Sequence, residues 1–178
     1  MKLNKSIKHV FAALIFSVAV AGIFACGNDN SLEELRNNEL ALLDTYMEEN
    51  YPDAEPTSSG LYFIEVKKGT GDTIKVGDQV QIYYATWMLK DSFLLDQSVG
   101  YLDGYRYEPF TVNVGSGASI AGLEEALTMN MQKGSVANLV INSKLAYGQN
   151  GNTYSEPYVP GFTTLLMQVE VYKIYKAN

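Results

Sequence analysis

A glycine-rich segment is the part of the sequence whose composition first suggests chemistry. The segment VGSGASIAGLEEAL covers residues 114–127, follows an apolar run typical of a strand, and continues as a predicted helix. Loops of this kind often bind phosphate, because the backbone N–H groups at a helix N-terminus attract an anion. A nucleotide site is therefore the first hypothesis to test.

The spacing of the residues argues against a nucleotide site. A dinucleotide loop needs a third glycine where Ile120 stands, and a P-loop needs a lysine where Leu123 follows the last glycine. Glu124 and Glu125 would occupy the first helical turn and repel a phosphate. The segment is better explained as a turn that leads from a strand into a helix, with glycines at the turn positions.

The N-terminal segment has the composition of an export signal. Lys2, Lys5 and Lys8 precede the apolar run VFAALIFSVAVAGIFA, which ends beside Cys26. This order is typical of a secretory signal peptide rather than a membrane span. The letters IFAC resemble a bacterial lipobox, in which the cysteine is acylated and becomes the mature N-terminus. We predict a lipoprotein-type signal peptide over residues 1–25 and lipidation of Cys26; the alternative is an ordinary secreted protein with one spare thiol.

Removal of this signal would leave an acidic chain without histidine and without a free thiol. The whole chain carries a net charge of −7, and its single histidine, His9, lies in the signal. An acidic balance argues against nucleic acid as a partner. Catalysis through Ser-His-Asp or Cys-His pairs and metal binding through His or Cys are excluded. We therefore expect no metal and no cofactor, and chemistry carried by carboxylates, hydroxyls and backbone groups.

A predicted helix separates the signal from the folded domain. Ser31 and Glu34 form a capping-box pattern at its start, and an apolar stripe along it is interrupted by Glu39. The stripe could dock on the domain or pair with another copy, but a semi-rigid spacer from the lipid anchor is the preferred interpretation. The linker PDAEPTSSG follows, and the predicted boundary lies inside it: the N-terminal region covers residues 26–58 and the domain covers residues 59–178.

The remainder of the sequence has the pattern of strands. Five apolar-rich runs occur, LYFIEVKK, DQVQIYYATWML, PFTVNV, SVANLVI and TLLMQVEVYKI. Three of them alternate, which predicts inward-facing side chains. These are Val80, Ile82 and Tyr84; Ala137, Leu139 and Ile141; and Leu165, Met167, Val169 and Val171. With one helix in SIAGLEEALTMN, the pattern predicts an α+β domain whose antiparallel sheet has the helix on its apolar face.

Four patches in order resemble the FKBP-type peptidyl-prolyl isomerases. They are VQIYYATWML…LLDQS, PFTVNVGSGASIAGLEEAL, MQKGSVANLVINSKLAYG and VPGFTTLLMQVEVYKI. The resemblance extends from Ser59 to Ile174. It implies a five-stranded antiparallel half-barrel wrapped around one short helix, with a shallow pocket between them for a prolyl residue.

The resemblance also implies the residues of the site. Those expected to act in catalysis are Asp96, Tyr147 and Ile120. Those expected to bind substrate are Tyr84, Leu95, Phe110, Ser119, Leu123, Val159 and Met167. The Ile120 N–H and the Tyr147 hydroxyl would bind substrate carbonyls, and Asp96, held by the Tyr84 hydroxyl, would place its charge near the twisting amide. Taken singly, the apolar residues could be plain core, Asp96 a loop cap and Tyr147 a turn anchor.

The sequence departs from the family pattern around the pocket. Leu123 stands where a tryptophan floor is common, and Leu95 and Met167 stand where aromatic rings are common. A bulge is expected around ATWM. An insertion, VGYLDGYRYE, is expected to flank the pocket, and the loop QNGNTYSEPYVPG is expected to bring further tyrosines to its other rim.

Two functions follow from the resemblance. The first is a lipid-anchored isomerase of the cell envelope that assists the folding of exported proteins by acting on their proline-containing segments. Its membrane contact would be the anchor at Cys26, and macrolides of the FK506 or rapamycin type would bind weakly without the pocket aromatics. The second is a peptide-binding or chaperone-like lipoprotein with little or no turnover.

Overall fold

The computed structural model describes residues 29–177, so the predicted signal peptide and Cys26 lie outside the described residues. Within these residues the chain divides into two units between Leu35 and Arg36, and the second unit begins at Arg36. The helices and strands, in chain order, are α2 (Asp29–Asn50), β1 (Tyr62–Lys67), β2 (Gln79–Met88), β3 (Leu94–Gln97), β4 (Phe110–Asn113), α3 (Ala121–Thr128), β5 (Val136–Ile141), the short 3-10 turns η1 (Ser143–Leu145) and η2 (Gly148–Asn150), and β6 (Leu165–Tyr175).

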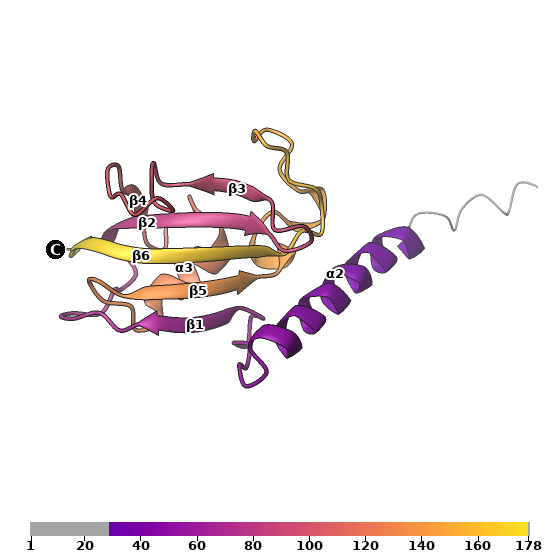
Figure 1. The fold of residues 1–178 in the computed structure, drawn as a ribbon, viewed down its shortest axis with the longest axis horizontal. Coiled ribbons are helices and arrows are strands. Elements are labelled where there is room, and N and C mark those ends of the chain that lie inside the picture. The colour runs from indigo at the N-terminus through magenta and orange to yellow at the C-terminus, as the bar shows by residue number, and fades with distance from the viewer. Residues whose placement is uncertain (1–28, 178) are drawn as a thin grey trace, which may run out of the picture. The chain divides into compact units, whose positions relative to one another are not determined.

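An antiparallel sheet organises the second unit (Figure 1). In the chain from Asp29 to Ala177 it has six strands in the order β1-β5-β6-β2-β3, with β4 also paired to β2. The sequence predicted five strands; the additional one is β3, whose four residues are too few to show a clear alternation. The register of β2 with β3 shifts between Thr86 and Trp87, inside the segment where a bulge was expected.

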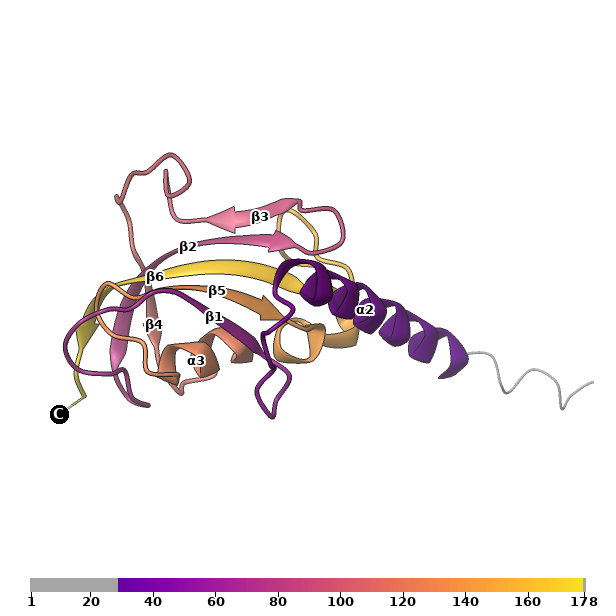
Figure 2. The same ribbon diagram turned by 60° about the horizontal axis from the view of Figure 1, so that its bottom comes forward.

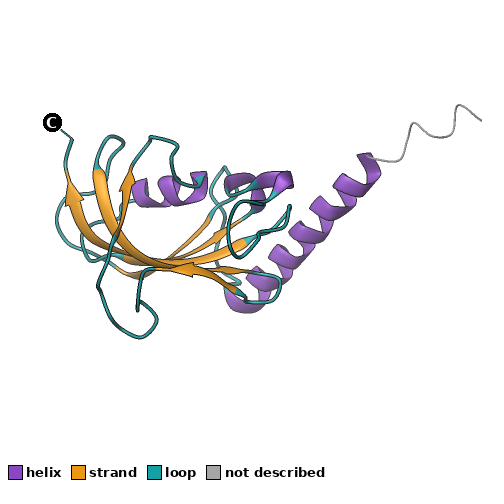
Figure 3. Cartoon of the chain, turned by 90° about the horizontal axis from the view of Figure 1, so that it is seen from above, coloured by secondary structure: helices purple, strands orange, loops and turns teal. Residues whose placement is uncertain are grey.

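The sheet curves around α3, which lies against one of its faces (Figures 2 and 3). Leu123, Ala126 and Leu127 of this helix are buried in the main core together with the predicted inward residues of β2, β5 and β6, except Tyr84, which is half-buried and packs against the core. A Cβ atom on Gly122 would lie 2.5 Å from Cγ2 of Ile141, so only glycine allows the helix to approach β5 this closely. The α+β fold and the side of the sheet that faces the core are as predicted.

The part of α2 that belongs to the second unit docks on the domain. Leu43 and Met47 are buried and form a small cluster with Leu89 and Val140. The spacer interpretation is therefore wrong for residues 36–50, since their apolar stripe is covered by the domain itself. No helix within residues 29–177 is both long and apolar enough to span a bilayer.

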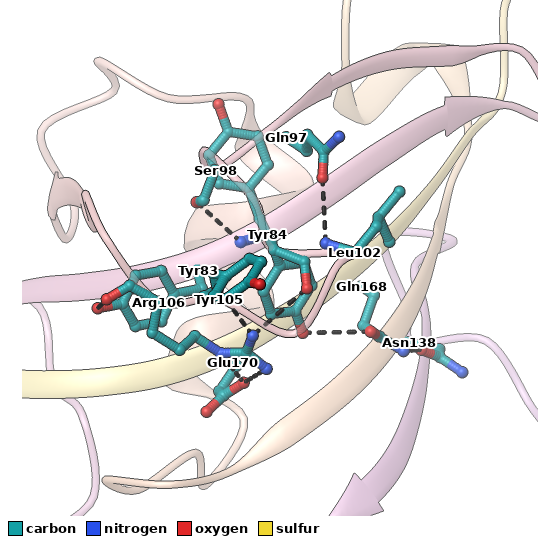
Figure 4. Close-up of polar contacts among 11 residues, drawn as sticks. Tyr83, Tyr84, Gln97, Ser98, Leu102, Tyr105, Arg106, Asn138, Gln168 and Glu170 are labelled. Carbon is teal, nitrogen blue, oxygen red and sulfur yellow. Dashed lines mark hydrogen bonds and ion pairs between the residues drawn. The ribbon is translucent and has the colours of Figure 1, made fainter.

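The tyrosine-rich insertion lies on the sheet face opposite α3, where Tyr83 rather than Tyr84 points. Tyr101 is buried and its ring stacks on Tyr83 with centroids 6.5 Å apart. The Arg106 guanidinium lies 4.4 Å from the Tyr101 ring centroid. It also pairs with Glu170 at 2.8 Å (Figure 4). The expectation that this insertion flanks the pocket is wrong, because an aromatic and cation–π cluster holds it on the other face.

A buried carboxylate joins the C-terminal segment to the turn before β2. Asp78 accepts hydrogen bonds from Lys176 Nζ at 2.9 Å and from the backbone N–H groups of Lys75 and Ala177 at 2.8 and 3.0 Å. Burial by itself would raise the pKa of Asp78, but these donors outweigh burial and lower it below the usual value.

The substitution Asp78→Asn is expected to lower the free energy of unfolding at pH 7 by about 2 kcal/mol, because it removes a charged acceptor from three donors. Since folding lowers the pKa of Asp78, its stabilisation is complete above the pKa of an unfolded aspartate, about 3.9. It is lost as the pH falls through the folded pKa. Urea unfolding at pH 7 and at pH 3 measures both effects, and the gap between wild type and variant should narrow at the lower pH.

The matched control for this experiment is Asp72→Asn, at an exposed aspartate a few residues earlier. It should leave the free energy of unfolding unchanged. An Asp78→Asn variant as stable as wild type at pH 7 would contradict the assigned role of this carboxylate.

Candidate functional site

A cavity of about 730 Å³ opens between the concave face of the sheet and the N-terminal end of α3. All ten residues that the sequence assigned to a site line it. They are Tyr84, Leu95, Asp96, Phe110, Ser119, Ile120, Leu123, Tyr147, Val159 and Met167. They come from β2, β3, β4, β6, the start of α3 and the loop between β5 and β6. The fold thus brings distant segments to one place, while the catalytic roles of these residues stay predictions.

The deep part of the cavity is apolar. Leu123 is 3% exposed and Met167 5% exposed, and Val159 and Leu165 beside them are also buried. On one wall the Phe110 ring meets Tyr84 edge-on, with centroids 5.7 Å apart. A floor of aliphatic side chains with an aromatic wall suits a small apolar ring, and it offers that ring no hydrogen bond.

A tyrosine–aspartate pair occupies the rim. The Tyr84 hydroxyl donates to Oδ2 of Asp96 at 2.5 Å, and the Gln97 N–H donates to Oδ1 at 2.8 Å. Burial, followed by the contact with Asp96, raises the pKa of Tyr84 well above its usual value, so its hydroxyl stays a donor. The Tyr84 contact is the one expected from the sequence, and it holds the exposed carboxylate of Asp96 at the mouth of the cavity.

Two of the residues expected to act in catalysis have a hydrogen-bond donor that is unpaired within residues 29–177. The backbone N–H of Ile120 has no acceptor there, and neither has the hydroxyl of Tyr147. Ile120 is the N-cap residue of α3 and has extended backbone angles, φ −62° and ψ 139°. A peptide entering the cavity would find two donors for its carbonyl groups above an apolar floor.

The glycine-rich segment encloses a carboxylate of its own. Glu124 accepts hydrogen bonds from the N–H groups of Gly115 at 2.8 Å, Gly117 at 3.3 Å and Ser119 at 3.2 Å. Gly115 and Gly117 have positive φ angles of 85° and 70°, as the turn requires. The N–H groups that could have held a phosphate are thus bound by a side chain, which is a stronger objection to a nucleotide site than the repulsion expected from the sequence.

The loop between β5 and β6 forms another wall, through residues that the sequence did not single out. Ser155, Glu156 and Pro157 line the cavity, whereas Tyr154, which is 98% exposed, and Tyr158 do not. The prediction that this loop brings tyrosines to the rim of the cavity is therefore wrong. The other lining residues missed by the sequence are Thr86, Ala118, Ala121, Ala146 and Leu165. Most of these adjoin an assigned residue in the chain, and that neighbourhood was the available signal.

The sequence is similar to those of a known protein family. The family model of the FKBP-type peptidyl-prolyl cis-trans isomerases matches residues 71–172. The FKBP-type 22 kDa peptidyl-prolyl cis-trans isomerase of Escherichia coli is 38% identical over 133 residues, which are 72% of this chain and 58% of that protein. The FK506-binding protein of Neisseria meningitidis is 28% identical over 117 residues, 66% of this chain and 98% of that protein.

Solved structures show the same fold. A peptidyl-prolyl cis-trans isomerase from Pseudomonas syringae superposes with a TM-score of 0.66 at 25% identity. The superposition covers 84% of this chain and 100% of the Pseudomonas chain. FkpA from Escherichia coli also gives a TM-score of 0.66, at 26% identity, and covers 99% of this chain and 76% of that one.

Glu124→Ala is expected to destabilise the protein by about 1–3 kcal/mol, because three backbone N–H groups lose their acceptor. Amide hydrogen exchange at Gly115, Gly117 and Ser119 should become faster, while chemical denaturation measures the loss of stability. The control Glu108→Ala changes an exposed glutamate and should alter neither quantity. Unchanged exchange at the three amides would show that Glu124 does not hold this turn.

Proposed function

The chain belongs to the FKBP-type peptidyl-prolyl cis-trans isomerases, and we propose that it catalyses the rotation of X–Pro peptide bonds in exported polypeptides. The observation that carries this proposal is the pair of unpaired donors, the Ile120 N–H and the Tyr147 hydroxyl, above an apolar floor. It is supported by the carboxylate of Asp96, which Tyr84 holds at the rim.

The reaction needs no nucleophile and no proton transfer. Rotation about a peptide bond has a barrier of about 18–20 kcal/mol, because the resonance of the amide is lost in the twisted geometry. Apolar surroundings around the proline ring remove water from the amide and disfavour its charge-separated planar form. Donors that fit the twisted form better than the planar one lower the barrier further.

Each residue then has a defined role. Leu123 and Met167 receive the proline ring, and Phe110 closes one side. The Ile120 N–H and the Tyr147 hydroxyl bind the carbonyl groups on either side of the bond that turns. Asp96 places negative charge near the carbonyl carbon of the twisting amide, and its contact with Tyr84 keeps it there.

A peptide-binding lipoprotein with little turnover is the second candidate. The observation in its favour is the aliphatic floor, since Leu123, Leu95 and Met167 offer no aromatic surface to stack on a proline ring. For the same reason we propose that macrolides of the FK506 type bind weakly. The retained donors favour the enzyme.

We propose further that the protein is held in the cell envelope by a lipid on Cys26. The basic and apolar segment before this cysteine supports the proposal, as does the lipobox-like sequence IFAC. In this arrangement the domain meets polypeptides that have just been exported, and many of those contain proline bonds that isomerise slowly.

Tyr147→Phe and Asp96→Asn are each expected to lower kcat/KM for a proline-containing peptide about tenfold, the equivalent of about 1.4 kcal/mol. Each variant removes one hydrogen bond or charge that favours the twisted amide while leaving the fold intact. A protease-coupled assay on residues 27–178, with several residues tried before proline, measures the rate.

The controls are Tyr158→Phe, on the same loop but outside the cavity, and Asp103→Asn, at an exposed aspartate. Both should retain wild-type activity. Absence of any acceleration by the wild-type protein would refute the enzyme and favour the binding protein. Full activity in Tyr147→Phe and Asp96→Asn would refute the assigned roles.

Cys26→Ser in the full chain is expected to release the protein from the membrane fraction, because the acyl acceptor is gone. Cell fractionation and metabolic labelling with a fatty acid measure the anchor directly. Ser17→Ala, within the apolar run, is the control and should remain membrane-bound and labelled. Membrane retention of the Cys26→Ser protein would argue for a different mode of attachment.

A further inference from the structure

The glutamate that interrupts the apolar stripe of α2 is buried in the domain. Glu39 is 5% exposed. Its Oε1 accepts from the Ser143 N–H at 2.6 Å and the Thr164 hydroxyl at 2.9 Å, and its Oε2 accepts from the Ser143 hydroxyl at 2.7 Å and Arg36 at 3.0 Å. Four donors around one carboxylate offset the free energy required to remove it from water.

The two partners in the domain stand at the two ends of one loop. Ser143 begins η1, and its carbonyl accepts from the Ala146 N–H at 2.9 Å, directly before Tyr147. Thr164 directly precedes β6, which starts at Leu165. Between these ends runs the loop that supplies Tyr147, Ser155–Pro157 and Val159 to the cavity.

The two sides of this loop are hydrogen-bonded to each other. The loop therefore has little internal freedom, and its position is set by its two ends. The backbones of Asn152 and Val159 pair through two hydrogen bonds, 2.8 and 3.1 Å long. The Phe162 N–H donates to the Gly148 carbonyl at 3.0 Å. A Cβ atom on Gly151 would lie 2.1 Å from the Val159 carbonyl oxygen, which shows how closely the two sides approach. A shift at either end would therefore move the cavity wall as a unit.

No other acceptor within the described part of the chain serves the Ser143 N–H or the Thr164 hydroxyl. Without the carboxylate both donors would stay buried and unpaired, which proteins avoid. The loop ends would then move toward water or toward each other to find new partners.

We infer that Glu39 is a positioning residue of the isomerase site: it joins α2 to both ends of the loop and thereby places the Tyr147 hydroxyl over the cavity. This inference rests on the proposed function. Glu39 itself does not line the cavity and touches no substrate. Its effect on catalysis is transmitted through Ser143, Ala146 and Tyr147.

The test compares Glu39→Leu, which removes the acceptor at similar size, with Glu39→Gln, which keeps one oxygen for the Ser143 N–H and the Thr164 hydroxyl. Glu39→Leu is expected to lower kcat/KM roughly tenfold at a temperature where the variant is fully folded, since small misplacements of a catalytic group are costly. Glu39→Gln should stay within about twofold of wild type. Glu48→Leu, at an exposed glutamate of the same helix, should have wild-type activity.

The second readout is the backbone amide NMR spectrum, which needs no catalysis. Amide shifts of Tyr147 and of residues 155–159 should change in Glu39→Leu and remain near wild type in Glu39→Gln. If Glu39→Leu does not fold, Thr164→Val, which removes one of the four donors, replaces it and should shift the same amides. The rest of the spectrum reports whether each variant is folded.

The outcomes separate this inference from the proposed function. A wild-type protein without isomerase activity refutes the proposed function, while loop shifts in Glu39→Leu would still show that Glu39 positions the wall. An active wild type and a folded Glu39→Leu variant with unchanged kcat/KM and unchanged loop shifts would overturn the inference. A Glu39→Leu variant with lower thermal stability but unchanged kcat/KM and unchanged loop shifts would also overturn it, because Glu39 would then only stabilise the fold.

Discussion

The close contact between α3 and the concave face of the sheet is the constraint on which the rest of the domain depends. Gly122 lets the helix lie directly against Ile141, and Leu123 and Leu127 then fill the core. Because the helix is short, beginning only after Ile120, its N-terminal end does not fill the space beneath the sheet. The cavity, its apolar floor and the unpaired Ile120 N–H all follow from this contact.

Carboxylates hold the loops of this acidic chain in place. Glu124 binds the N–H groups of the glycine-rich turn, and Asp78 joins the C-terminal segment to the turn before β2. Glu125 accepts from the Thr57 and Ser59 hydroxyls and so ties the linker to α3. Glu39 does the same for the loop between β5 and β6. A carboxylate accepts several hydrogen bonds at once, so one side chain can fix several backbone donors.

The two candidate functions differ in how the same cavity is used. Binding of a proline-containing segment uses the apolar floor and the donors for its carbonyl groups, whereas isomerisation also requires that these donors favour the twisted amide over the planar one. The Asp96 carboxylate held by Tyr84 favours the enzyme, because a cavity that only binds does not need a charge beside the twisting amide. The aliphatic floor changes how the proline ring is bound, but it leaves the two donors and the Asp96 carboxylate in place.

The sequence by itself determined five of the six strands within residues 29–177, the core helix and the family resemblance, because apolar-rich runs and ordered motifs are local properties of the chain. It also placed ten residues around a cavity that the structure contains.

Only the tertiary structure decided where the insertion lies and what Glu39 and Glu124 bind. Tyr101 and Arg106 pack on the outer sheet face because partners on β2 and β6 are there, and Glu39 meets Ser143 and Thr164 from more than a hundred residues away in sequence. Contacts of this kind depend on which surfaces the fold brings together, and no local pattern of residues specifies them.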